Sequence, residues 1–178
     1  MNIDAQSKEI LANLKSTDSE VILETIGKVR ESGNSFLIEE MIDLLHDTED
    51  PAIKKSFFNL LSELKDKAST HVLIAAIKNE KYSRERAILI ACCWQNGLSY
   101  NEYLPFFIDL VINEDFQIAF EAFTVIENMY GKMEEVVVND EIKKVINALK
   151  DANEQKAYLL NGLLSIIRNI PEQQESAE

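Results

Sequence analysis

A seven-residue pattern recurs five times along this 178-residue chain and limits its fold more than any other feature. The copies are "ILANLKS", "MIDLLHD", "LIAAIKN", "FIDLVIN" and "VINALKD", and they begin at Ile10, Met41, Leu73, Phe107 and Val145. Their starts are 31, 32, 34 and 38 residues apart. The first, second and fifth positions are always apolar and the seventh is Ser, Asp or Asn. Each copy therefore predicts an apolar helical stripe that runs into a polar turn.

A second apolar segment with helical spacing follows each turn. These segments open near Val21, Ile53, Ala87, Ile118 and Ala157. Asp50 and Pro51 are typical of an N-cap followed by the first helical residue. Gly33, Gly97 and Gly131 stand where second helices should end, and Pro171 stands where the last one should end. The pattern predicts about ten helices and no sheet, with the β-branched run at 134–140 as an insertion or an early start of a helix.

The paired helices, with acidic turns such as those at Asp50 and Asp115, resemble HEAT repeats over about residues 3–170. The resemblance implies an all-α, right-handed α-solenoid of about five helical hairpins, whose second helices line a concave face that holds partners. Lys54 stands where the second HEAT helix usually has Arg, so armadillo-like and other helical repeats remain alternatives. The expected repeats are 3–33, 34–66, 67–97, 98–131 and 132–170, in a single domain over 1–170 with an acidic polar tail at 171–178.

The charge balance is acidic, with 18 Lys and Arg against 31 Asp and Glu and a net charge of -13. Such a chain repels nucleic-acid phosphates and anionic lipid and favours a basic protein or peptide as partner. The first ten residues, "MNIDAQSKEI", lack the layout of a signal peptide, and no apolar run reaches the ~20 residues that span a bilayer. We therefore expect a cytoplasmic protein that binds neither nucleic acid nor membrane.

The stretch "AILIACCWQNG" at 87–97 contains both cysteines and the single tryptophan. Aligned with the other second helices, Cys92 and Trp94 occupy apolar columns and are expected in the core. Cys93 occupies a mixed column and is the thiol expected to be more reactive. Neighbouring cysteines without CxxC spacing predict neither a disulfide framework nor a metal site.

Both histidines, His46 and His71, align with charged residues and are expected on the solvated surface. Nucleophile elbows, phosphate-binding glycine loops and metalloprotease spacings are absent from the sequence. We therefore expect no catalytic residue, no metal and no cofactor, and hence a protein that is not an enzyme.

The stretch 87–131 has no Lys or Arg but six acidic residues, Glu102, Asp109, Glu114, Asp115, Glu121 and Glu127. Apolar residues also extend beyond the core columns of the later second helices. Together these features predict a partner-binding face made of Leu89, Ile90, Cys93, Phe120, Glu121, Glu127 and Leu160.

The function expected from these features is that of a non-enzymatic scaffold or adaptor, which holds a basic protein segment on an acidic and partly apolar concave face. One alternative is an immunity or antitoxin-like neutraliser of a basic protein. A second is a HEAT-like DNA glycosylase, which the net charge disfavours. A weak homodimer through Leu159, Leu160 and Leu163 of the last repeat is a further alternative for the apolar positions.

Overall fold

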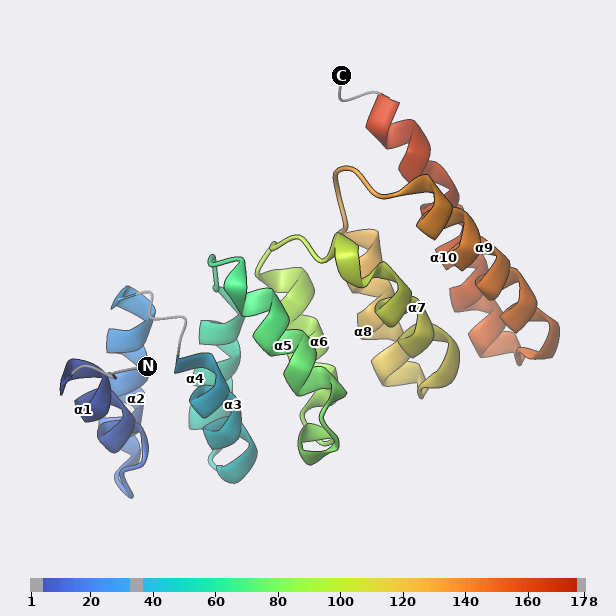
Figure 1. Ribbon diagram of the computed structural model, residues 1–178. Helices are drawn as coiled ribbons and strands as arrows, with labels where there is room; N and C mark the ends of the chain where they lie inside the picture. The colour runs from blue at the N-terminus through green and yellow to red at the C-terminus, as the bar shows by residue number, and fades with distance from the viewer. Residues whose placement is uncertain (1–4, 33–36, 176–178) are drawn as a thin grey trace. The chain divides into compact units, whose positions relative to one another are not determined.

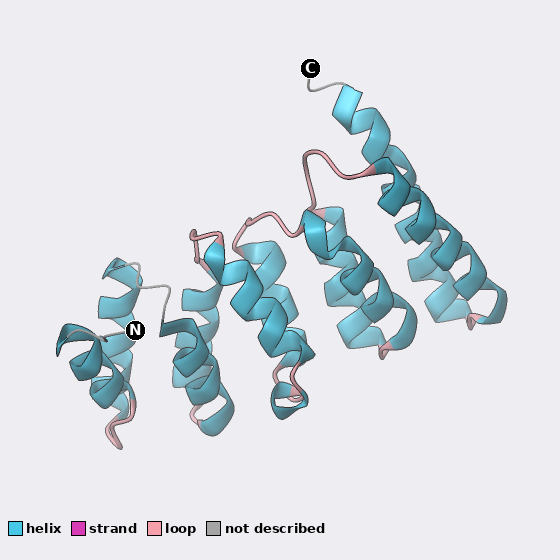
Figure 2. Cartoon of the chain, in the orientation of Figure 1, coloured by secondary structure: helices cyan, strands magenta, loops and turns pink. Residues whose placement is uncertain are grey.

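The computed structural model describes residues 5–32 and 37–175, and within these ranges the chain forms ten α-helices and no strand (Figure 2). The helices are α1 (Ala5–Leu14), α2 (Ser19–Ser32), α3 (Ile38–Asp47), α4 (Pro51–Ser62), α5 (Ala68–Lys78), α6 (Arg86–Gln95), α7 (Leu104–Asn113), α8 (Phe116–Glu127), α9 (Glu135–Ala148) and α10 (Glu154–Glu175). Short 3-10 turns, η2 (Glu80–Tyr82), η3 (Asn101–Tyr103) and η4 (Leu149–Asp151), lie in the connections. The predicted all-α architecture with about ten helices is confirmed.

The helices follow one another as pairs, as the recurring pattern predicts. Each copy of the pattern lies in or at the end of an odd-numbered helix, and each even-numbered helix begins within three residues of its predicted start. Helix α9 begins at Glu135, so the β-branched run is the early start of a helix and not an insertion.

The chain divides into two compact units, residues 1–98 and 99–178. Within the first unit, α1, α3 and α5 each pack against the next helix, α2 also packs against α4, α4 against α6, and α3 against α5 (Figure 1). Within the second unit, α7 packs against α8 and α9, and α10 packs against α8 and α9. The division, between residues 98 and 99, lies one residue after the predicted boundary between the third and fourth repeats, 67–97 and 98–131.

The apolar positions of the recurring pattern form the core of both units. Its first position is buried in all five copies: Ile10, Met41, Leu73, Phe107 and Val145. The second position is buried in the three central copies, but it is half-buried at Leu11 and 42% exposed at Ile146. Leu11 belongs to the first copy of the pattern and Ile146 to the last.

Some helix ends follow the predicted capping residues. The Asp50 carboxylate accepts hydrogen bonds from the backbone N–H groups of Ala52 and Ile53, at 2.8 and 3.4 Å, and Pro51 is the first residue of α4. Gly97, two residues after the end of α6, has a φ angle of 67°, a region that favours glycine. The capping prediction for Gly131 is wrong: this glycine also has a positive φ, 86°, but α8 already ends at Glu127 with Asn128 as its C-cap. Gly33 lies outside the described residues.

The end of the last helix differs from the prediction. Helix α10 continues through Pro171 to Glu175, so the proline does not end it and the predicted tail at 171–178 is helical over its first five residues. A helix that continues through a proline loses one backbone hydrogen bond there, and the ring crowds the carbonyl group four residues before it. No described helix combines the length and apolarity that a membrane crossing requires.

Helices α8 and α10 approach closely where α10 has a glycine. A Cβ atom added at Gly162 would lie 3.3 Å from the Phe123 ring, so the ring occupies the space that a larger residue would fill. This contact is one of those through which α10 packs against α8.

Candidate functional site

Four of the seven predicted partner-binding residues are buried. Leu89, Ile90, Cys93 and Leu160 are each at most 1% exposed, so they belong to the core and do not form an exposed face. The same correction applies to the leucines proposed for a homodimer, because Leu159 and Leu163 are also buried. Phe120 and Glu127 are exposed, and Glu121 is half-buried.

These residues are buried because α6 and α10 each pack against more than one neighbouring helix. Helix α6 packs against α4 and also against α5, and α10 packs against α8 and α9. A helix with neighbours on two sides buries a stripe wider than the roughly 100° of a simple amphipathic helix. The extra apolar positions of α6 and α10 are used in this wider stripe.

The cysteines and the tryptophan also differ in part from expectation. Cys92 is buried as predicted, but Cys93 is buried too, with its Sγ 3.4 Å from the Leu89 carbonyl oxygen. Its burial removes the accessibility on which its expected higher reactivity was based. Trp94 is half-buried, whereas Leu60 and Val125, its counterparts in other repeats, are buried. The indole ring is too large to be covered fully at this position.

An aromatic pair is the most exposed apolar feature of α8. Phe116 is 45% exposed and Phe120 is 49% exposed, and their rings stack with centroids 6.0 Å apart and planes inclined at 30°. Glu127 follows on the same side of the helix, since positions i, i+4 and i+11 share one stripe. The prediction did not include Phe116, although the four-residue spacing of the two phenylalanines is visible in the sequence. We call Phe116, Phe120 and Glu127 the α8 surface.

The acidic stretch 87–131 is less negative than its sequence indicates. Lys144 of α9 places its Nζ 3.0 Å from Asp109 Oδ1. Lys156 of α10 lies near Asp115 and Glu114, whose charges oppose the lowering of the Lys156 pKa by burial. Cations from the following repeat thus lie beside three of the six acids, and a count along the sequence cannot detect them.

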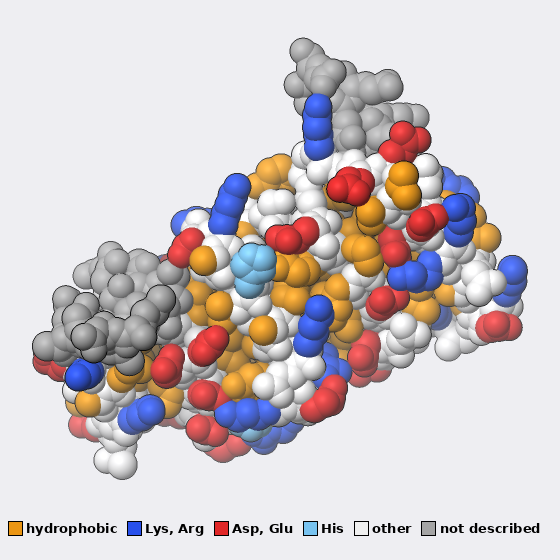
Figure 3. Space-filling view, viewed as in Figure 1, with side chains coloured by type: hydrophobic (Ala, Val, Ile, Leu, Met, Phe, Trp, Pro, Cys, Tyr) orange, Lys and Arg blue, Asp and Glu red, His pale blue; other side chains and the backbone are white. Residues whose placement is uncertain are grey.

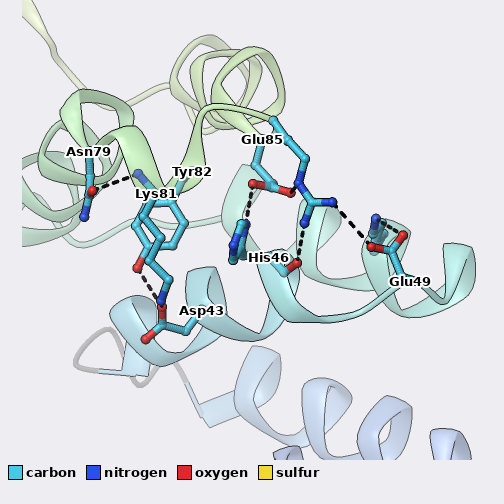
Figure 4. Close-up of polar contacts among 9 residues, drawn as sticks. Asp43, His46, Glu49, Asn79, Lys81, Tyr82 and Glu85 are labelled. Atoms are coloured by element: carbon cyan, nitrogen blue, oxygen red, sulfur yellow. Dashed lines mark hydrogen bonds and ion pairs between the residues drawn. The ribbon is translucent and has the colours of Figure 1, made fainter.

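A polar cluster in the first unit joins α3 to the connection between α5 and α6 (Figure 4). Tyr82 Oη donates a hydrogen bond of 2.7 Å to Asp43 Oδ1, and the Lys81 ammonium pairs with the same oxygen. His46 Nδ1 lies 2.9 Å from Oε2 of the buried Glu85. The prediction that His46 is solvated is wrong, because the ring is half-buried in this cluster; His71 is exposed as predicted.

The pKa shifts of Asp43 and Tyr82 do not favour acid–base chemistry by these two groups. Hydrogen bonds from Lys81 and then from Tyr82 lower the pKa of Asp43. Burial and the hydrogen bond to Asp43 raise the pKa of Tyr82. Both shifts move these groups away from neutrality, where a general acid or base works best. The cluster is therefore suited to fastening the α5–α6 connection to α3.

A metal site is not found among the described residues, which contain no group of three or more His, Cys, Asp or Glu side chains able to hold an ion. No protein-family model matches the chain. No curated protein has a significantly similar sequence.

Proposed function

We propose that this chain is a HEAT-like α-solenoid of five helical hairpins that acts as a non-enzymatic adaptor for a basic protein segment. Two observations support the architecture. Each copy of the sequence pattern gives one helical hairpin, and within each unit odd-numbered helices pack on odd-numbered ones and even on even. Such stacking of like helices is typical of helical repeat proteins.

The observation that carries the binding function is the exposed aromatic pair of the α8 surface. Phenylalanines that stack on one another while half-exposed leave apolar area that a partner can cover. Covering the exposed halves of both rings is worth on the order of 2 kcal/mol, or roughly 30-fold in affinity. Glu127 on the same stripe, together with the net charge of -13, favours a basic segment beside the rings.

Photo-crosslinking tests this proposal. Phe120 is replaced by p-benzoylphenylalanine, the protein is irradiated in its native lysate, and the crosslinked segment is identified by mass spectrometry. We expect one dominant partner whose crosslinked segment has a net positive charge. The matched control places the same group at Val136, which is 72% exposed on α9 of the same unit. Equal capture from both positions, or a captured segment without positive charge, would contradict the proposal.

The purified partner then allows the two contributions to be separated. Phe116→Ala combined with Phe120→Ala should weaken binding roughly 10- to 30-fold, mainly by faster dissociation. Glu127→Lys should instead slow association, and more strongly at low salt. The identity of the captured protein distinguishes an adaptor from a neutraliser of a basic toxin.

A further inference from the structure

A groove between α3 and α5 lies next to the polar cluster of the first unit. It encloses about 230 Å³. The residues that line it include two carboxylates of α3, apolar residues of α3 and α5, and one aromatic ring: Glu39, Asp43, Ile42, Ala75, Ala76 and Tyr82. Figure 3 shows this side of the first unit, where apolar side chains lie between acidic ones.

The sequence explains why the groove occurs at this repeat. Ala75 and Ala76 are the third and fourth residues of their copy of the pattern, whereas the preceding copy has Asp43 and Leu44 there. Two consecutive alanines leave space beside α3 that longer side chains would fill. On the α5 side the groove is therefore lined by two small apolar residues, of which Ala75 is exposed and Ala76 is buried.

The wall formed by α3 carries two carboxylates of like charge. Glu39 and Asp43 are four residues apart on one face of the helix, a spacing at which like charges destabilise a helix. A cation between them would relieve this repulsion. Tyr82 adds an aromatic ring, which attracts a cation over its face.

The Lys81 side chain lies beside two of these residues, Asp43 and Tyr82. Its ammonium pairs with Asp43 and lies 5.0 Å from the centroid of the Tyr82 ring. The side chains of both Lys81 and Asp43 are 45% exposed, so water reaches the ion pair and little desolvation opposes its exchange for another cation. One cation thus already lies against two of the residues that line the groove, Asp43 and Tyr82, in an ion pair that water reaches.

We propose that the groove between α3 and α5 receives an arginine side chain of a protein partner, which displaces Lys81 from Asp43. The methylene groups of the arginine lie on Ala75 and Val72, and its guanidinium meets Glu39 and Asp43. This contact is on the first unit and is independent of the α8 surface, so either proposal can fail without the other.

Arginine fits this groove better than the other candidates. Its guanidinium is planar, makes paired hydrogen bonds to carboxylates and stacks on an aromatic ring, whereas an ammonium acts as a point charge. The groove is smaller than the roughly 300–1,000 Å³ of small-molecule sites. A single side chain of a macromolecule matches its size and chemistry.

Nuclear magnetic resonance titration of the full chain tests the proposal. The probe is the capped peptide acetyl-Ala-Ala-Arg-Ala-Ala-amide, and the same peptide with citrulline in place of arginine is the uncharged control. We expect amide shifts confined to residues 39–43 and 72–82 with the arginine peptide, and none with the citrulline peptide. Equal shifts with both peptides, or shifts spread over all acidic surfaces, would overturn the proposal.

Variants of the chain test the displacement of Lys81. Lys81→Gln should tighten binding of the arginine peptide roughly two- to fivefold, because Asp43 no longer has an internal partner. Lys55→Gln removes the same charge from an exposed position on α4 and should leave the affinity unchanged. Equal tightening by both variants would show a general charge effect and overturn the proposal.

Loss of binding provides a further check. Asp43→Asn should abolish the shifts while the circular dichroism spectrum of the variant stays that of the parent chain. Retained binding in a folded Asp43→Asn protein would also overturn the proposal. Replacing Phe120 with Ala should leave this titration unchanged, because that residue belongs to the other surface.

Discussion

At the scale of single residues, Asp43 is the residue of α3 that bonds to the connection between α5 and α6. It accepts hydrogen bonds from Lys81 and Tyr82, which lower its pKa below the ordinary value of 3.8. A lowered folded-state pKa means that the folded protein binds this proton less readily than the unfolded chain. The resulting stabilisation is fully present above the pKa of an unfolded Asp and is lost as the pH falls through the folded-state value.

We therefore predict that Asp43→Asn lowers the free energy of unfolding at pH 7 and has little effect near pH 2. The loss should be about 1 kcal/mol or less, because Asp43 and Lys81 are both well exposed. Urea titrations at the two pH values measure it. Asp47→Asn, at an exposed position at the end of the same helix, is the matched control and should change the free energy of unfolding at pH 7 by less than Asp43→Asn does. Equal losses at pH 7 and pH 2 would contradict this assignment.

At the scale of elements, Lys156 joins α10 to the end of α7. Its Nζ donates hydrogen bonds to the carbonyl oxygens of Val111 and Glu114, at 2.8 and 2.7 Å. The last carbonyls of a helix have no partner within the helix, and a cation there is also favoured by the helix dipole. Lys65 does the same for α6, with its Nζ 3.1 Å from the Asn96 carbonyl oxygen.

Lys156→Met should destabilise the protein by about 1 to 3 kcal/mol, since it keeps most of the aliphatic stem but removes the ammonium group that donates to the carbonyls of Val111 and Glu114. Thermal or urea unfolding measures the loss. Lys150→Met is the matched control, because Lys150 is exposed and bonds to the Asn147 side chain. Its effect should stay within about 0.5 kcal/mol. A similar loss in both variants would mean that the capping bonds contribute nothing specific.

The helices could be predicted from the sequence, and their contacts could not. Periodicity located each helix and its core columns because these depend on neighbours three or four residues away. The His46–Glu85 pair joins residues 39 apart, and Lys156 meets a carbonyl 45 residues before it. Such contacts depend on how whole helices stack. Interpreting Leu89 and Leu160 as exposed failed for the same reason, because the width of a buried stripe depends on the number of neighbouring helices.

At the scale of the whole molecule, the chain is predicted from sequence to be one domain over 1–170, while its described residues group into two compact units. A repeat chain gains stability from each hairpin and from each junction between neighbours. The prediction of one domain therefore requires that the two units unfold together.

The half-buried Trp94 makes this requirement measurable. It is the single tryptophan of the chain and lies in α6 of the first unit, so tryptophan emission follows the unfolding of residues 1–98 alone, whereas far-ultraviolet ellipticity follows all ten helices. For one cooperative domain, we expect the two signals to give the same midpoint and the same denaturant slope in a guanidinium titration. An emission change with its own midpoint and a shallower slope would identify the first unit as a separately folding body. The fluorescence of this one indole ring thus reports the unfolding of residues 1–98 separately from that of residues 99–178, without an added label.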